Sequence, residues 1–248
     1  MRLYLHQLRS EQLVFWRSRE AAIFIFIFPV MLFLLLGAVY SGQYEGRPVA
    51  DYLVMGLLTY GCANTAFAGF AISLVIRRES GILKRIRSTP LPQGLYFAGA
   101  LTSILLVFVL QSLVLMGIGR LAYDAALPEL PLQLAAVLGF GAVAFAAMGV
   151  GIAGLIRSSE GASAVVNVVV LPMAFLSGAF GPTRDLPQFL QALADVLPLR
   201  HLVEAVEATY LRADGIGSEL GSLLVIAVWG LVGLVVAARR FGWEPRER

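Results

Sequence analysis

Six segments of the sequence, each 19 to 25 residues long, contain no Asp, Glu, Lys, Arg or His. They are residues 22–40, 52–76, 97–119, 132–156, 163–181 and 220–238. A helix of about 20 residues crosses the roughly 30 Å hydrocarbon core of a bilayer, so every segment is long enough to span it. Helix is the expected form because backbone amides in lipid must be satisfied within the spanning structure. We therefore predict an all-α membrane protein with six transmembrane helices in a single domain over residues 1–248.

The composition excludes an ordinary soluble domain. The chain is 58% hydrophobic and 14% charged, against about 45–50% and about 25% in soluble proteins. The single cysteine, Cys62, lies inside an apolar segment, so we predict no disulfide within the chain. The sequence has no phosphate-binding G-x-x-x-x-G-K-[ST] loop and no C-x-x-C or H-E-x-x-H pattern, and we expect this chain to bind no cofactor or metal itself.

The basic residues predict the orientation of the chain. Fourteen of the 19 lie before the first segment, in the loops after segments two and four, and in the tail. Basic loops stay in the cytoplasm, so we expect both termini to be cytoplasmic in a multi-pass protein of a prokaryotic inner or plasma membrane. The first segment is longer than the apolar core of a secretory signal and follows a polar leader, so it is predicted to be retained. Anionic lipid is an expected partner and nucleic acid is not.

The leader, residues 1–21, is predicted to be an amphipathic helix at the inner membrane interface. Its apolar and basic residues separate onto two faces at helical spacing, with Tyr4, Leu8 and Phe15 on one and Arg2, His6, Arg9 and Arg17 on the other. Such a helix lies flat with its arginines toward lipid phosphates. A leader whose charges only set the topology is the alternative.

The loop from Pro182 to Glu219 keeps an apolar periodicity of its own. Its two apolar runs are Leu186, Leu190, Leu193 and Leu197, and then Leu202, Val203 and Val206. Asp185 and Pro187 mark a helix start before the first run. Arg200, Glu204 and Glu207 occupy the polar side of the second. We predict two short extracytoplasmic helices that rest on or dip into the outer leaflet, and we favour a structural lid over a binding site.

The loop after the second segment holds the densest charge in the chain. Five basic residues surround Glu79, and they are Arg77, Arg78, Lys84, Arg85 and Arg87. Ile82, Leu83 and Ile86 form an apolar stripe of one helical turn between them. A residue before proline disfavours helix, so Pro90 ends this element. Topogenic or lipid-binding arginines would explain the charge, but not the stripe.

Two stretches carry a resemblance to a known family. RRESGILKRIRSTPLP resembles the cytoplasmic loop of the ABC type-2 exporter permeases, whose pattern runs approximately E-R-E-x-G-T-L-x-x-L-x-x-T-P-L. Matches fall at Arg78, Glu79, Gly81, Leu83, Thr89, Pro90 and Leu91, and departures at Arg77, Ile82 and Ile86. FLSGAFGPTRDLPQFLQALADVLPLRHLVEAV, residues 175–206, is similar to the family segment after the fifth span.

The resemblance implies a half-transporter that is not itself an enzyme. It would pair with a second copy or a paralogue and bind two cytosolic ATP-binding subunits, which hold ATP and Mg²⁺. The helix in the loop would couple the permease to those subunits through Arg78, Glu79, Gly81, Ile82, Leu83, Lys84, Arg85, Ile86 and Arg87. Glu79 is expected to pair with a basic residue of the partner or of the leader. Multidrug efflux and antibiotic resistance are functions of this kind of exporter.

In relatives the second and fifth spans line the transport path. The candidates in this chain are Thr59, Tyr60, Asn64, Phe67, Ser163, Asn167 and Phe175, and Tyr60, Asn64 and Phe67 share a face at α-helical spacing. Hydrogen bonding between helices would explain the polar ones equally well. Phe, Tyr and Asn suit an amphipathic or hydrophobic substrate such as a drug or lipid, and a sugar polymer remains open.

Two other functions compete with ATP-driven export. The spans carry no ionisable residue of the kind that ion-coupled carriers keep in the bilayer, which leaves a channel or lipid scramblase that needs no ATP. An intramembrane serine protease would use Ser177 and His201. The sequence before Ser177 lacks the glycine of a G-x-S-G motif and His201 lies outside the spans, so this reading is disfavoured.

Overall fold

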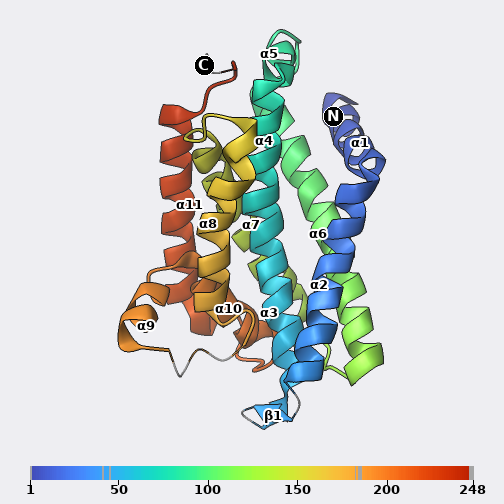
Figure 1. The fold of residues 1–248 in the computed structure, drawn as a ribbon, viewed down its shortest axis with the longest axis vertical. Coiled ribbons are helices and arrows are strands. Elements are labelled where there is room, and N and C mark those ends of the chain that lie inside the picture. The colour runs from blue at the N-terminus through green and yellow to red at the C-terminus, as the bar shows by residue number, and fades with distance from the viewer. Residues whose placement is uncertain (1, 41, 45, 182, 184–185, 246–248) are drawn as a thin grey trace.

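The structure, a computed structural model, describes residues 2–40, 42–44, 46–181, 183 and 186–245. Within them, six helices are long and apolar enough to cross a bilayer, as the sequence predicted (Figure 1). These are α2 (Arg19–Val39), the continuous helix of α3 (Val49–Ala63), η1 (Asn64–Gly69) and α4 (Phe70–Glu79), α6 (Gln93–Tyr123), α7 (Pro131–Ala153), α8 (Ser159–Ser177) and α11 (Leu220–Arg240).

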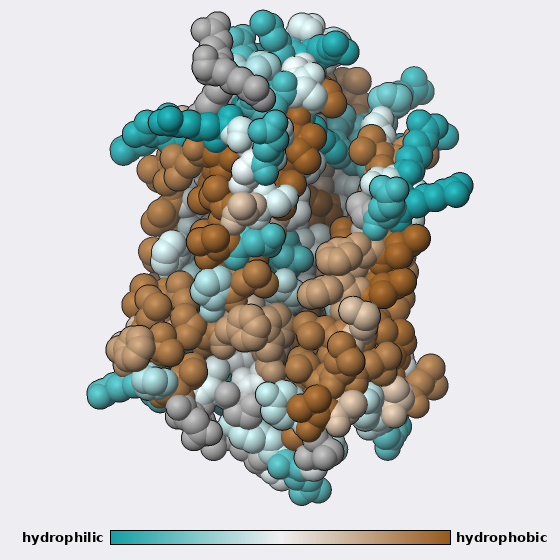
Figure 2. All heavy atoms as spheres, in the orientation of Figure 1, coloured by the Kyte–Doolittle hydropathy of each residue, from teal (hydrophilic) through white to brown (hydrophobic). Residues whose placement is uncertain are grey.

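The shorter elements gather at the two ends of this bundle. They are α1 (Arg2–Arg17), the hairpin of β1 (Gln43–Tyr44) and β2 (Arg47–Pro48), α5 (Ile82–Arg87), α9 (Gln188–Ala194), α10 (Pro198–Tyr210) and η2 (Ile216–Glu219). Figure 1 shows α5 and both chain ends at one end, here the α5 end, and the hairpin, α9 and α10 at the other, the α9 end. Hydrophobic side chains form a belt between two hydrophilic ends (Figure 2).

Local caps move the ends of the helices away from the predicted spans. The fifth span was predicted at residues 163–181, but α8 begins four residues earlier, where the side chain of Ser158 accepts a hydrogen bond from the Gly161 amide. It ends at Ser177 because Gly178 adopts a left-handed conformation with φ of +87°, which stops a helix at little cost for glycine. The fourth span was predicted to end at residue 156, and α7 ends at Ala153.

A π-helical turn interrupts the second span. Residues Asn64–Gly69 form η1 between two α-helical stretches. A π turn is wider than an α turn, so the spacing that placed Tyr60, Asn64 and Phe67 on one face is not kept through this region. Tyr60 and Phe67 are buried, whereas Asn64 is only half-buried. Wide turns of this kind occur often at functional sites.

The two helices after the fifth span differ from each other in their surroundings. α9 exposes apolar side chains, Phe189 and Leu193 among them, as expected for a helix at a leaflet surface. α10 instead packs inside the bundle against α3, α7, α8 and α11, and its Leu202 and Val206 are fully buried. The second predicted helix, α10, is therefore packed inside the bundle and does not rest on the leaflet surface. Asp185, the predicted cap, lies outside the described residues.

A buried tyrosine closes the α9 end. The Tyr210 hydroxyl at the end of α10 donates to the carbonyl of Ala126 (2.8 Å), and the amide of Ala126 donates to the Asp51 carboxylate of α3 (2.8 Å). Burial, with a smaller contribution from the Asp51 charge, raises the pKa of Tyr210 above its usual value, so the phenol remains a neutral donor. The loop between α6 and α7 is thus tied to both α3 and α10.

Glycine lets α7 approach its neighbours at backbone distance. A Cβ placed on Gly149 would lie 2.8 Å from the carbonyl oxygen of Phe67 and 3.2 Å from that of Ala66, both in η1. Small residues at helix crossings allow this closeness in membranes, where packing drives association. A Cβ on Gly139, earlier in α7, would meet no atom within 4 Å. The two glycines therefore form a matched pair for testing the crossing.

We predict that Gly149→Ala destabilises the protein by about 1–3 kcal/mol, because the added methyl group overpacks a backbone contact that cannot yield. Gly139→Ala should be neutral or slightly stabilising, since it fills open space and lowers the entropy of the unfolded chain. Thermal unfolding of the purified variants in detergent measures both. Equal unfolding temperatures for the two variants would contradict the close crossing.

Candidate functional site

The helix α5 stands at the extreme of the α5 end (Figure 1). Gly81, with φ of +73°, turns the chain between α4 and α5, a conformation that favours glycine. After α5 the Thr89 hydroxyl donates to the Ile86 carbonyl (2.7 Å), which satisfies one of the orphan acceptors of the helix end. This predicted short helix is therefore present and has a defined start and end.

The predicted apolar stripe of α5 divides into an anchor and an exposed part. Leu83 is 0% exposed and belongs to the hydrophobic core, and Ile86 is half-buried against that core. Ile82 is 43% exposed. Lys84, Arg85 and Arg87 are exposed as well. We call Ile82, Lys84, Arg85 and Arg87 the α5 surface, since these side chains are accessible to another molecule.

Arg78, predicted to act in coupling, does not reach this surface. Its side chain is fully buried. The guanidinium donates to the carbonyl oxygens of Ala153 (2.9 Å) and Ile156 (2.7 Å) and to the carboxylate of Glu79 (2.8 Å). The first two acceptors lie at and just beyond the end of α7, where the helix dipole favours a positive charge. Arg78 therefore fastens the end of α4 to the end of α7.

An ion pair does join the loop to the leader, but the loop supplies the positive charge and the leader supplies the negative one. Glu79 was predicted to pair with the partner or the leader, but it pairs with its neighbour Arg78. The leader instead supplies Glu11, whose carboxylate accepts two hydrogen bonds from Arg77 at 2.7 and 2.6 Å. Arg77 also donates to the Tyr96 hydroxyl (3.0 Å). Paired, fork-like bonds of this kind are among the stronger ones in proteins, and here they join α1, α4 and α6.

The leader forms the predicted helix over Arg2–Arg17, four residues short of its predicted end because α2 already begins at Arg19, and it packs along α6. The Tyr4 hydroxyl donates to Thr102 (2.8 Å), and the Gln12 amide donates to the hydroxyl of Ser103 (2.9 Å). The predicted apolar face is half-buried and the predicted basic face is exposed. Glu11 is buried on this helix, and its charge is paired with Arg77.

The structure separates the predicted path residues into two groups. Thr59, Tyr60 and Phe67 are buried within this chain, and the Thr59 hydroxyl donates to the Met55 carbonyl of its own helix (2.9 Å). A buried Tyr60 ring packs edge-on against Phe180 with centroids 4.9 Å apart. These three side chains contribute to packing inside this chain.

The other group lies on the surface of the hydrophobic belt. Ser163, Asn167 and Phe175 are exposed along α8, and Asn64 is half-buried in η1, with which α8 is in contact. Figure 2 shows hydrophilic side chains within the brown belt on the face where Figure 1 places α4 and α8. Polar groups facing hydrocarbon without partners are costly. This face of α8 is therefore suited to contact with protein or with a water-filled path rather than with lipid.

A cavity at the α9 end was not predicted from the sequence. It has a volume of about 490 Å³ and lies between the hairpin, the start of α3, the end of α8 and α10. The polar side of α10, noted in the sequence, forms part of its wall through Arg200, Glu204 and Glu207. The sequence feature that could have predicted it is a group of three tyrosines within thirteen residues, Tyr40, Tyr44 and Tyr52, all of which line the cavity.

The side chains considered for a serine protease have separate partners. The Ser177 hydroxyl donates to the Ala174 carbonyl (2.8 Å). The His201 ring has Nε2 2.8 Å from the Asp195 carbonyl oxygen and Nδ1 3.3 Å from the Glu204 carboxylate. A serine nucleophile requires a base within hydrogen-bond reach, and these contacts do not provide one. In the described part of the chain, no three His, Cys, Asp or Glu side chains are placed to hold a metal ion.

Comparison with known proteins adds independent information. The model of the ABC-2 type transporter family matches residues 3–211, which includes nearly all of α1 and the whole of α5, the hairpin, α9 and α10. The chain is 25% identical over 195 residues to the putative transport permease YvfS of Bacillus subtilis, which covers 78% of this chain and 76% of the relative. It is 26% identical over 213 residues to nodulation protein J of Bradyrhizobium diazoefficiens, with 84% and 78% covered.

A third relative is longer than this chain. The probable multidrug ABC transporter permease YbhR of Escherichia coli is 28% identical over 160 residues. That match covers 63% of this chain and 43% of YbhR, so the similarity extends over less than half of the relative.

We predict that Arg78→Gln destabilises the protein by about 3–5 kcal/mol, as expected when a buried, fully bonded charge is removed and its carboxylate partner is left behind. Arg87→Gln, which removes an exposed charge from the same segment, should change stability by less than about 0.5 kcal/mol. Thermal unfolding in detergent compares the two. A loss of similar size in both variants would show that the Arg78 bonds do not hold α4 to α7.

Proposed function

Because the chain belongs to the ABC-2 type transporter family, we propose that it is the membrane subunit of an exporter driven by ATP hydrolysis in separate cytosolic subunits. Those partners would bind ATP and Mg²⁺, and two of them would serve each complex. The observation that carries the proposal is the α5 surface, an exposed basic and apolar helix anchored at the end of a bundle whose spans were predicted without charge. A bundle of this kind has no evident means of using an ion gradient.

The α5 surface has the properties of a docking element. Leu83 fixes the helix to the core, so a force on Ile82 is passed to the bundle instead of bending a loose loop. An apolar side chain surrounded by three cations fits a partner groove with an apolar floor and acidic edges. Anionic lipid would attract the cations by about 1 kcal/mol each, but it would not account for a partly exposed isoleucine among them at this end of the molecule.

The exposed face of α8 supports a second permease subunit, either a copy or a paralogue. Ser163 and Asn167 would be removed from lipid by a partner, and together with Asn64 and Phe175 they would line a path between the two subunits. A wall of amides, hydroxyls and aromatic rings suits an amphipathic or hydrophobic substrate, such as a drug or lipid. YbhR is named a probable multidrug permease, and multidrug efflux with antibiotic resistance is the corresponding proposal for this chain.

The positive-inside rule supports a cytoplasmic α5 end. Both termini would then be cytoplasmic, and the cavity at the α9 end would face the outside of the cell. The arginines of α1 would lie at the inner interface, near lipid phosphates. YvfS, YbhR and nodulation protein J come from bacteria, which supports a prokaryotic plasma or inner membrane.

We predict that Ile82→Asp abolishes coupling to the ATP-binding subunit, since it places a charge in the apolar centre of the docking contact. The complex is captured by affinity purification from the native membrane, and the variant should retain less than about a tenth of the wild-type partner, a loss of at least 1.4 kcal/mol. ATP-dependent export should fall in parallel.

Leu127→Asp is the matched control, because Leu127 is an apolar residue with 59% exposure at the opposite end. It should retain both partner binding and transport. Full ATP-dependent export by Ile82→Asp, at normal abundance in the membrane, would reject α5 as the docking element and with it the observation that carries this function.

We predict that Asn167→Cys in two copies of the chain is joined by a short thiol-specific bifunctional reagent, because equivalent residues near a two-fold axis come close together. Leu224→Cys, at a residue 66% exposed on α11, should remain monomeric on a denaturing gel. The native Cys62 is buried and does not interfere. Cross-linking at Leu224 but not at Asn167 would place the second copy on another face.

A further inference from the structure

The cavity at the α9 end has the size and the divided lining of a small-molecule site. Its volume of about 490 Å³ falls within the roughly 300–1,000 Å³ of ligand pockets. Leu53 and Met55 of α3 and Val203 of α10 form an apolar part of the wall. Met55 lies six residues inside the start of α3, a depth of about 9 Å at the helical rise per residue. The cavity therefore extends from the polar end into the edge of the hydrophobic belt.

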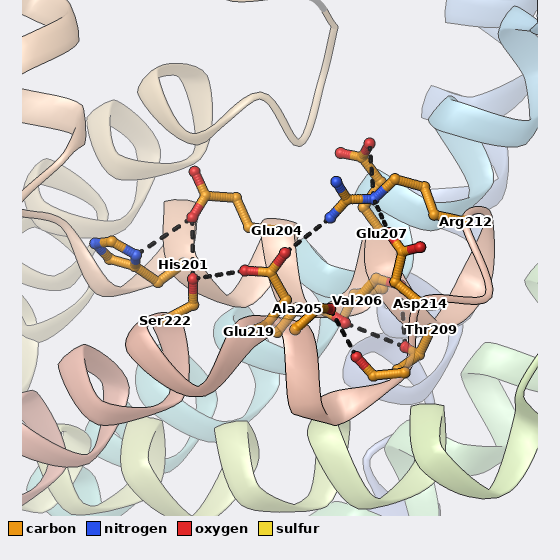
Figure 3. A network of polar contacts seen from close by, with 12 residues as sticks. His201, Glu204, Ala205, Val206, Glu207, Thr209, Arg212, Asp214, Glu219 and Ser222 are labelled. Carbon is orange, nitrogen blue, oxygen red and sulfur yellow. Dashed lines mark hydrogen bonds and ion pairs between the residues drawn. The ribbon is translucent and has the colours of Figure 1, made fainter.

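One connected network of ion pairs and hydrogen bonds, part of which is drawn in Figure 3, contributes four side chains to the polar wall, and these are Arg200, Glu204, Glu207 and Arg212. Arg200 pairs with Asp195 (3.1 Å) and Glu204 (3.2 Å). The Ser222 hydroxyl lies 3.1 Å from the Glu204 carboxylate and 3.0 Å from the Glu219 carboxylate, and its single proton is shared between these two acceptors, which joins the two halves of the network.

Arg212 is the centre of the second half of the network. It pairs with Glu219 (2.8 Å), Asp214 (3.4 Å) and Glu207 (3.8 Å). The network thus contains five carboxylates against two guanidinium groups and the imidazole of His201. Since five carboxylates share two guanidinium groups, the network as a whole keeps an excess of negative charge. Glu204 and Glu207 line the cavity beside Arg200 and Arg212, so the excess of negative charge comes from Asp195, Asp214 and Glu219, which do not line it.

Tyrosines face these carboxylates from another part of the chain. Tyr40 follows α2, Tyr44 lies on β1 and Tyr52 on α3, and all three line the cavity. The rings of Tyr44 and Tyr52 meet edge to face, with centroids 5.1 Å apart. Aromatic rings attract organic cations through their π electrons, and sets of them recognise quaternary ammonium groups. Rings and carboxylates at one end and aliphatic side chains at the other favour a ligand with a cationic head and an apolar tail.

We propose that this cavity binds a cationic amphiphile, a molecule with an ammonium head and a hydrocarbon tail. The head lies between Glu204, Glu207 and the tyrosines, and the tail lies along Leu53, Met55 and Val203. The place of the site in transport, on the exit side of the membrane, rests on the export function proposed above. Binding itself requires only this chain.

The test measures binding to the purified full-length chain in lipid nanodiscs, without an ATP-binding subunit. Octyltrimethylammonium and octanoate are the probes, because they share chain length and differ in the sign of their charge. Isothermal titration calorimetry, corrected with empty nanodiscs, should show one octyltrimethylammonium per chain and at least tenfold weaker binding of octanoate. Equal affinity for the two probes, or uptake of the cation no greater than by empty nanodiscs, would overturn the proposal.

Variants locate the site. Glu207→Gln should weaken octyltrimethylammonium binding about fivefold by removing one carboxylate, and Tyr44→Leu should weaken it to a similar extent by removing one ring. Tyr44 carries no charge, so its variant tests the site without altering the ion pairs. Glu129→Gln is the control, because Glu129 pairs with Arg47 at the same end and does not line the cavity. Unchanged binding in both Glu207→Gln and Tyr44→Leu would place the ligand elsewhere.

The two proposals fail separately. If the chain binds the cation saturably but never transports with an ATP-binding subunit, the proposed binding site stands and the proposed export function is rejected. If the chain exports with ATP but does not distinguish octyltrimethylammonium from octanoate, the proposed export function stands and the proposed binding site is rejected.

Discussion

The buried guanidinium of Arg78 determines how the α5 end is built. It belongs to the last turn of α4 and donates to carbonyl groups at the end of α7, and separating the two helices would leave those carbonyls unpaired and the guanidinium with Glu79 as its remaining partner. That cost, about 3–5 kcal/mol for a buried charge, makes the two helices move as one. Arg77 extends the joint to α1 through Glu11. A displacement of α5 is therefore carried by three helices together, as transmission from a docked partner would require.

Much of the fold was predictable because lipid acts on each residue separately. Charge is costly at every position of a span, so six uncharged stretches identify six spans. Their ends depend instead on single contacts, such as the Ser158 cap and the left-handed Gly178 of α8. The π turn of η1, which α7 crosses closely at Gly149, has no comparable signal in the sequence. The pattern of α10 predicts an apolar face, but a face against lipid and a face against protein have the same periodicity.

The position of the candidate site in the chain was predictable, but which of its side chains are buried and which are exposed was not. A six-residue helix bearing Ile82, Leu83 and Ile86 has too few turns for periodicity to tell which side chain faces the core. Arg78 and Lys84 both look like surface charges in the sequence, and only the arrangement in space shows that one is buried and the other exposed. The cavity combines residues between the end of α2 and the middle of α3 with residues about 150 positions later, so neither segment predicts it alone.

The polar groups along the proposed path change in character from one end to the other. The exposed face of α8 offers neutral amides and hydroxyls, whereas the α9 end offers carboxylates. A cationic amphiphile that leaves the bundle would thus move from neutral groups toward carboxylates that attract its positive charge. Attraction that is too strong would hold the molecule at the exit, because transport requires sites that are occupied and then emptied. Arg200 and Arg212, each bonded to several carboxylates, reduce the net charge of that wall and so favour release over retention.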